Sequence, residues 1–276
     1  MSVLQVTIGT LAVLAVAVFG GVWALQTYGI YRFDPHPGVP AAFGLPETVR
    51  IASYMSEDGA PIHAWIADPV PSRPVILALY GNQSSIGGSM GRILPLIDAG
   101  YGIVMMEYRG SGATAGTPSE KNFARDARAL YDQMDTLIGR TVPPQERVVY
   151  GFSLGTGVGS RLAAERPFGA AIFEAAPYRN CLYLEDHYFG LPLCRLMWAE
   201  RYDIVDHVQH IKAPKLFIHG TLDQALPVER ARQLFMEAPE PKEYVQLEGG
   251  GHADLHKHGL FSAIEAFLQQ HLQPAD

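Results

Sequence analysis

A serine between two glycines stands near the middle of the chain, in the sequence GFSLG at residues 151–155. The serine directly follows the apolar run RVVYGF and precedes a pattern typical of a helix. Such a serine is typical of a nucleophile on a sharp, strained turn from strand to helix, where only small flanking residues fit. The first N–H groups of the helix would be free to stabilise a negatively charged oxygen. The alternative is that Ser153 is an ordinary turn residue.

A serine hydroxyl is a weak nucleophile, so it needs a base and an acid that orients the base. The expected chain order is Ser, then Asp or Glu, then His. Asp223 follows an apolar strand in FIHGTLDQALP, and His252 follows the last predicted strand in VQLEGGGHADL. The carboxyl ends of parallel strands share one sheet edge, where ligands bind. We therefore predict a triad of Ser153, Asp223 and His252, with Asp203 or Asp206 as alternative acids.

In this triad Ser153 attacks an acyl carbonyl, and His252 takes the serine proton and returns it to the leaving group. Asp223 fixes the tautomer of the imidazole and stabilises its protonated form. Activity should therefore fall when the pH drops and His252 becomes protonated. Each of the three residues has a structural alternative as a turn or loop residue.

Neither a metal nor another cofactor is expected. His252, His256 and His258 have spacings that suggest a metal site, but Asp254 is the one further ligand type beside them, so we expect His256 and His258 on the surface. The glycine-rich segment 81–91 has neither the lysine of a phosphate-binding loop nor the pattern of a dinucleotide site. Arg109, which follows a predicted strand, is expected to form a structural ion pair.

Eight short apolar or alternating runs predict strands, and helical patterns separate most of them. The runs cover 48–55, 62–68, 74–80, 102–108, 147–152, 170–176, 215–220 and 243–249. Nearly continuous apolar strands are typical of a parallel sheet that is buried on both faces. Alternating strands and helices predict an α/β fold with a mostly parallel, doubly wound sheet of about eight strands. The helices are expected over 90–100, 120–139, 154–167, 227–238 and 259–272.

The segment 179–209 interrupts this alternation and is predicted to be a short helical lid over the carboxyl edge of the sheet. Its apolar residues favour a lipid-like acyl substrate, although lids also bury such residues simply to dock. They are Tyr183, Tyr188, Phe189, Leu191, Leu193, Leu196, Met197 and Trp198.

The first 31 residues carry no charged side chain. Residues 6–25 are almost wholly apolar and would form a helix of about 30 Å, the thickness of the bilayer hydrocarbon. We predict a single transmembrane anchor over 1–31, with a signal peptide or a buried core helix as alternatives. Arg32 slightly favours a cytoplasmic position for the following domain, but the side is left open. A Pro-rich tether over 32–46 should connect the anchor to a hydrolase-type domain over 47–276.

The chain has 276 residues, 48% of them hydrophobic and 18% charged, with a formal net charge of −7. This composition fits a large globular domain and, with no basic stripe, argues against nucleic acid as a partner. Cys181 and Cys194 could form one disulfide in an oxidising compartment or remain two thiols. The oligomeric state is not indicated.

From residue 48 to the end, the chain resembles the α/β-hydrolase superfamily, and in particular its membrane-anchored serine hydrolases of the α/β-hydrolase domain-containing type. The resemblance rests on LYGNQSS, EYRGSGATAGTPSE, GFSLG, HGTLDQALP and GGGHADL. It implies the same triad and an oxyanion hole made by the backbone N–H groups of Leu154 and Asn82. The chain departs from the family pattern at Tyr80, where histidine is usual, and at residues 83–85, where smaller residues are common.

We therefore expect a membrane-tethered serine hydrolase that cleaves acyl esters or thioesters through an acyl-enzyme intermediate. Two alternatives are a peptidase or amidase of the same fold and a catalytically silent binding protein of that fold. The substrate would be a small-molecule or lipid-like acyl compound, and no cofactor is implied.

Overall fold

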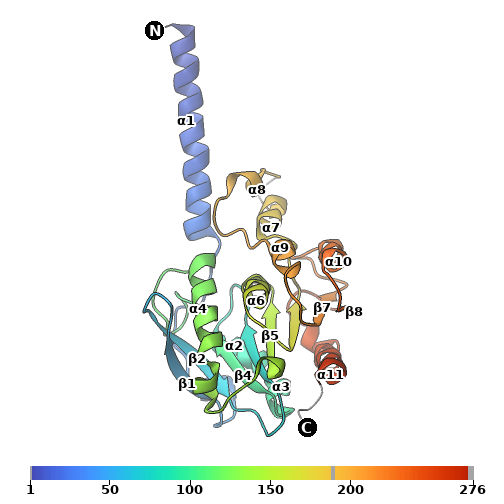
Figure 1. Ribbon diagram of the computed structural model, residues 1–276. Coiled ribbons are helices and arrows are strands. Elements are labelled where there is room, and N and C mark those ends of the chain that lie inside the picture. The colour runs from blue at the N-terminus through green and yellow to red at the C-terminus, as the bar shows by residue number, and fades with distance from the viewer. Residues whose placement is uncertain (1, 188–189, 273–276) are drawn as a thin grey trace.

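One sheet of eight strands forms the centre of the computed structural model, which describes residues 2–187 and 190–272 (Figure 1). The strand order is β1-β2-β4-β3-β5-β6-β7-β8. Strand β2 pairs antiparallel with β1 and β4, and the other neighbours are parallel. The predicted, mostly parallel sheet is therefore confirmed. The strands are β1 (Arg50–Met55), β2 (Pro61–Ala67), β3 (Val75–Leu79), β4 (Gly102–Met106), β5 (Arg147–Phe152), β6 (Ala170–Glu174), β7 (Lys215–Gly220) and β8 (Lys242–Leu247).

Helices connect most of the strands. They are α1 (Val3–Ala24), α2 (Ile86–Arg92), α3 (Leu94–Asp98), α4 (Glu120–Asp132), α5 (Met134–Ile138), α6 (Leu154–Glu165), α7 (Asn180–His187), α8 (Leu193–Leu196), α9 (Ile204–Val208), α10 (Val228–Glu237) and α11 (Leu260–His271). Short 3-10 or π turns are η1 (Leu25–Gly29), η2 (Pro40–Phe43), η3 (Pro144–Glu146) and η4 (Leu255–Lys257).

Two predicted helices are each divided in the structure. The helix expected over 90–100 breaks at Ile93, between α2 and α3. Pro95 follows at the start of α3, and its missing N–H prevents a continuous helix there. The helix expected over 120–139 breaks at Gln133, whose side-chain amide donates to the carbonyl of Met55 in β1 at 2.8 Å.

The interior of the sheet explains the apolar runs in the sequence. Every residue of β3, β4, β6 and β7 is buried. Such strands lie between layers on both faces of the sheet, so they need apolar residues at successive positions rather than at alternate ones. The edge strand β1 instead shows exposed residues at alternate positions.

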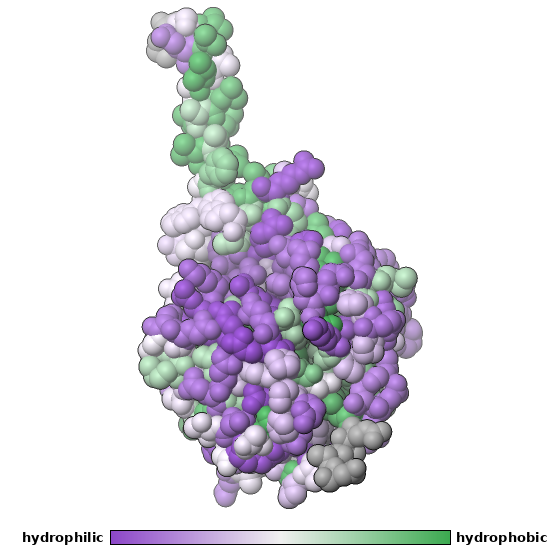
Figure 2. Space-filling model, viewed as in Figure 1, coloured by the Kyte–Doolittle hydropathy of each residue, from purple (hydrophilic) through white to green (hydrophobic). Residues whose placement is uncertain are grey.

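Helix α1 projects away from the rest of the protein as a long rod (Figure 1). Its surface is mostly hydrophobic, with some polar residues near the N-terminal end (Figure 2). The stretch Val3–Gly29 is long and apolar enough to cross a membrane, and only 6% of its most apolar window is buried within the protein. An exposed apolar helix of this length fits a membrane anchor or a signal sequence, and it does not fit the core-helix alternative.

The base of α1 is attached to the lid. Val22 and Ile30 are buried in a cluster with Cys181 and Leu184 of α7. The side-chain carbonyl of Gln26 accepts hydrogen bonds from the backbone N–H groups of Trp198 and Ala199, at 3.0 and 2.8 Å.

The segment expected to be a tether contacts the domain near its two ends, while most of its residues are exposed. Phe33 packs beside Tyr31, Tyr108 and Phe123, and Leu45 is only 6% exposed. These aromatic contacts fix the chain immediately after α1 and its π turn.

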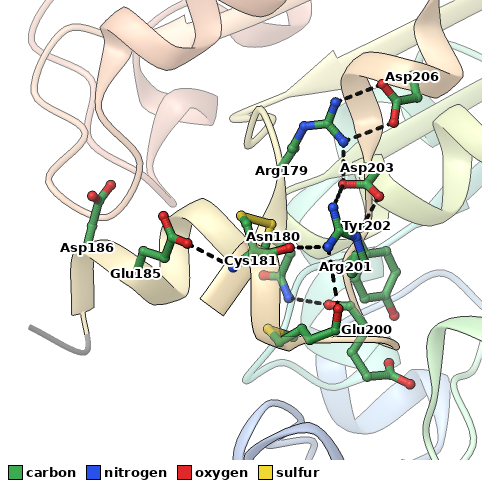
Figure 3. The surroundings of a disulfide bond; sticks show 12 residues. Arg179, Asn180, Cys181, Glu185, Asp186, Glu200, Arg201, Tyr202, Asp203 and Asp206 are labelled. Carbon is green, nitrogen blue, oxygen red and sulfur yellow. Dashed lines mark hydrogen bonds and ion pairs between the residues drawn. A yellow bond between two sulfur atoms is a disulfide. The ribbon is translucent and has the colours of Figure 1, made fainter. Parts of the chain in front are cut away.

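The lid region contains α7, α8 and α9, and a disulfide joins Cys181 to Cys194 (Figure 3). Of the apolar residues predicted there, Leu193 and Met197 are buried, whereas Leu191 and Trp198 are 54% and 57% exposed. Tyr188 and Phe189 lie outside the described residues.

Candidate active site

Ser153 occupies a strained turn between β5 and α6. Its backbone has φ 51° and ψ −117°, a region that residues with a Cβ rarely adopt. An added Cβ at Gly155 would lie 2.0 Å from the Leu79 carbonyl oxygen, and one at Gly151 would lie 2.6 Å from the Gly155 carbonyl oxygen. The turn therefore requires glycine on both sides of the serine, and it presents the serine at the carboxyl end of β5.

The structure brings Ser153, His252 and Asp223 together. The His252 Nε2 atom lies 3.0 Å from Ser153 Oγ, and its Nδ1 atom lies 2.8 Å from Asp223 Oδ2. Because an ionised carboxylate only accepts hydrogen bonds, Nδ1 carries the proton and Nε2 faces the serine as the acceptor. The Asp223 side chain is fully buried, while that of His252 is 26% exposed.

The surroundings of Asp223 favour its ionised form. Burial alone would raise the pKa of the carboxyl, but hydrogen bonds from His219 and His252 hold the pKa well below its usual range. The N–H groups of Ala225 and Leu226 also donate to Oδ1, at 2.9 and 2.8 Å. Sequence reasoning missed His219, whose Nε2 lies 3.2 Å from Asp223 Oδ2. His219 lies near the end of β7, four residues before Asp223 in the loop that follows, and this spacing was the available signal.

The alternative acids Asp203 and Asp206 lie elsewhere, in the lid. Arg179 donates to both carboxylates, at 2.5 and 2.8 Å (Figure 3). Arg201 also binds Asp203, at 2.9 Å. Both aspartates are thus part of an arginine network, and Asp223 is the acid that meets the imidazole.

Two backbone N–H groups at the site are free to bind an anion. Within the described residues, neither the Leu154 N–H nor the Asn82 N–H donates to a protein acceptor. Leu154 begins helix α6, whose dipole favours negative charge at that end. Asn82 lies in the loop after β3, next to Gly81, where an added Cβ would lie 3.3 Å from the Ser153 Cβ.

Tyr80, which stands where the family has histidine, supports this loop from beneath. It is buried, and its hydroxyl donates to Ser111 Oγ at 3.2 Å and accepts from the Tyr108 N–H at 3.1 Å. The Tyr108 hydroxyl in turn donates to the Tyr80 carbonyl at 3.0 Å. Tyrosine at this position therefore still holds the end of β3 in place through these hydrogen bonds.

Ser153 and His252 open into a cavity of about 650 Å³. Its walls come from the end of the N-terminal helical region, the loop after β3, the lid and the loop after β7. They include Ile30, Arg32, Asn82, Tyr183, Leu184 and Leu226. A separate hollow of about 710 Å³ lies between the segment 69–74 and α11, and no triad residue lines it.

The other polar residues singled out in the sequence lie away from the triad contacts. Arg109 binds Asp126 and Asp58 at 2.6 and 2.8 Å, so the expected ion pair is confirmed. The side chains of His256 and His258 are each partly exposed. In the described part of the chain, no group of three or more His, Cys, Asp or Glu side chains is arranged to hold a metal ion.

The chain is similar to several known proteins, although no family model matches it. An uncharacterised protein of Mycobacterium tuberculosis is 30% identical over 270 residues, which cover 95% of this chain and 94% of that protein. Lysophosphatidylserine lipase ABHD12 of Danio rerio is 31% identical over 191 residues, or 62% of this chain and 49% of the lipase. Among solved structures, the esterase Pf2001 of Pyrococcus furiosus superposes with a TM-score of 0.69 at 18% identity, covering 88% of this chain and 99% of the esterase.

Proposed function

The chain belongs to the α/β-hydrolase superfamily, and we propose that it is a membrane-tethered serine hydrolase that cleaves acyl esters or thioesters. The observation that carries this proposal is the continuous hydrogen-bond chain from Ser153 through His252 to Asp223. A strained serine, an oriented imidazole and a buried carboxylate together support nucleophilic acyl transfer.

The proposed reaction has two halves. In the first, His252 Nε2 takes the Ser153 proton while Oγ attacks the acyl carbonyl, and the resulting tetrahedral intermediate expels the alcohol or thiol, which receives the proton. In the second, His252 activates a water molecule that attacks the acyl-enzyme and releases the acid. Asp223 holds the Nδ1–H tautomer and stabilises the imidazolium in both halves.

The free N–H groups of Leu154 and Asn82 support an oxyanion hole for the tetrahedral intermediates. Each would donate to the carbonyl oxygen as it gains charge, and each donor of this kind contributes about 100- to 1,000-fold in rate. The start of α6 adds its dipole to this stabilisation.

The walls of the cavity support an acyl substrate with an apolar chain. Ile30, Leu184 and Leu226 offer apolar surface, and the cavity lies beside the base of the exposed apolar helix. Lipid-like esters or thioesters fit this position better than short polar acyl groups do.

We propose further that residues 1–31 form a single-pass membrane anchor and that residues 47–276 form the hydrolase domain, with the lid over 179–209. Attachment of the base of α1 to the lid favours an anchor that is retained over a cleaved signal peptide. The Cys181–Cys194 disulfide supports an oxidising compartment for the domain, opposite to the side that Arg32 alone favours.

Hydrolysis of p-nitrophenyl esters from acetate to palmitate by the full chain in detergent micelles tests the function. We expect turnover that depends on chain length and disappears in Ser153→Ala. The matched control is Ser53→Ala, which changes an exposed serine on the edge strand β1 and should keep wild-type turnover. A folded wild-type protein that hydrolyses none of these esters would favour the silent binding protein.

A further inference from the structure

The side chain of Asn82 links the loop after β3 to the chain that leaves the N-terminal helical region. Its Nδ2 donates to the Ile30 carbonyl at 2.6 Å, and its Oδ1 accepts from the Arg32 N–H at 3.0 Å. A backbone carbonyl only accepts and a backbone N–H only donates, so these two partners fix the orientation of the amide. The two backbone groups belong to residues on either side of Tyr31.

Tyr31 fastens the same short segment on its other side. Its hydroxyl binds the Glu200 carboxylate and lies 2.7 Å from the Tyr202 hydroxyl. Its ring meets Phe123 edge-on, with 5.3 Å between the centroids. Ile30 is only 6% exposed and packs with the lid. Residues 30–32 are therefore held by the loop after β3, the lid and the core at once.

The loop that Asn82 occupies needs such support. Gln83, the next residue, has φ 58°, a left-handed conformation that is unfavourable for a residue with a Cβ. Strained conformations persist where surrounding contacts determine them, and the two hydrogen bonds of the Asn82 amide are such contacts. The same residue carries one of the two free backbone N–H groups beside Ser153.

We propose that residues 30–32, where the chain leaves the membrane helix, support the geometry of the active site. In this proposal Asn82 is the positioning residue that connects them to the oxyanion hole. This inference rests on the proposed hydrolase function. The N-terminal region then does more than hold the enzyme at a membrane. Residues 30–32 position the Asn82 N–H that stabilises the tetrahedral intermediate, and Ile30 and Arg32 also line the cavity.

Asn82→Leu tests the proposal in the full chain, because leucine has a similar size and keeps the backbone N–H but loses both side-chain hydrogen bonds. We expect kcat for an oxoester to fall about 10- to 100-fold, as for a donor displaced by about 1 Å, with KM nearly unchanged. The kcat for the matching thionoester should fall much less, since a thiocarbonyl sulfur accepts hydrogen bonds more weakly and is stabilised less by the oxyanion hole. The rate ratio of oxoester to thionoester should therefore fall, whereas a merely structural defect would lower both rates equally.

Asn122→Leu is the matched control, because its amide lies in the first turn of α4 and makes an exposed hydrogen bond to the Thr117 carbonyl. It should keep the wild-type kcat and the wild-type ratio. Asn82→Ala is the second variant if the leucine does not fold, and the same fall in the ratio is expected.

The two proposals fail differently. An active wild-type enzyme whose rate ratio is unchanged in a folded Asn82 variant overturns only the role of residues 30–32 and Asn82. A folded wild-type protein without turnover overturns the hydrolase function and this inference with it.

Discussion

Arg92 and Glu174 form a buried ion pair directly behind the turn that carries Ser153. The Glu174 carboxylate is fully buried and also binds the Tyr150 hydroxyl. The Glu174 carbonyl accepts the Ser153 N–H at 2.9 Å. The Arg92 guanidinium lies over the Phe152 ring, 4.4 Å from its centroid. The pair thus ties α2 to the end of β6 beneath the nucleophile.

We predict that Arg92→Met lowers the free energy of unfolding by about 3–5 kcal/mol, because it leaves the Glu174 charge buried without its partner. The double variant Arg92→Met/Glu174→Gln should lose much less, since no unpaired charge remains. Thermal and urea unfolding of the full chain in detergent measures both losses. Arg161→Met, which breaks the exposed pair with Glu165, is the control and should cost less than about 1 kcal/mol. A double variant as unstable as Arg92→Met would argue against a charge effect.

We predict that Gly155→Ala abolishes activity and strongly destabilises the fold. The new methyl group would lie 2.0 Å from the Leu79 carbonyl oxygen, and neither backbone can move without displacing β3 or the start of α6. Circular dichroism and ester turnover measure the two effects. Gly91→Ala is the matched control, because its methyl group would meet nothing closer than 3.7 Å. Wild-type turnover in Gly155→Ala would show that the turn is less constrained than the structure indicates.

We predict that His207 makes the protein less stable in mild acid. Burial, together with the nearby Arg161, lowers the pKa of His207 from 6.5 to about 4. The unfolded chain therefore binds a proton that the folded chain does not, and stability is lost as the pH falls from 6.5 towards 4. After allowance for partial exposure, the loss is about 1–2 kcal/mol.

His207→Gln should flatten this part of the stability profile, which unfolding measured at pH 7 and at pH 4.5 would detect. His210→Gln, at an exposed histidine three residues later, should leave the profile as in the wild type. A profile for His207→Gln that matches the wild type would contradict the assigned cause.

The residues of the site that could be predicted are marked by the sequence immediately around them. Ser153, Asp223 and His252 each follow a predicted strand, and the carboxyl ends of parallel strands meet at one sheet edge. The strands themselves were visible as apolar runs, so the fold followed from them and is confirmed. The sequence favoured Asp223 as the acid but left Asp203 and Asp206 as alternatives, because the pairing of both with Arg179 is a contact between separate parts of the chain.

The parts that the sequence missed depend on contacts between distant residues. The Asn82 amide binds a segment about 50 residues earlier, and Arg92 pairs with a carboxylate 82 residues later. No local pattern marks such pairs, since each side chain has an ordinary place in its own loop or helix. The proline-rich segment 32–46 was predicted to be a short extended tether, and its sequence did not indicate the aromatic packing of Phe33 at its start.

The most direct test of the central claim is to react the folded full chain with a fluorophosphonate and to locate the adduct by peptide mass spectrometry. We predict one adduct per chain, on Ser153, with labelling that is lost in Ser153→Ala and much slower in His252→Ala. A folded wild-type chain without an adduct, or with the adduct on another residue, would contradict the claim that Ser153 is a nucleophile activated by His252.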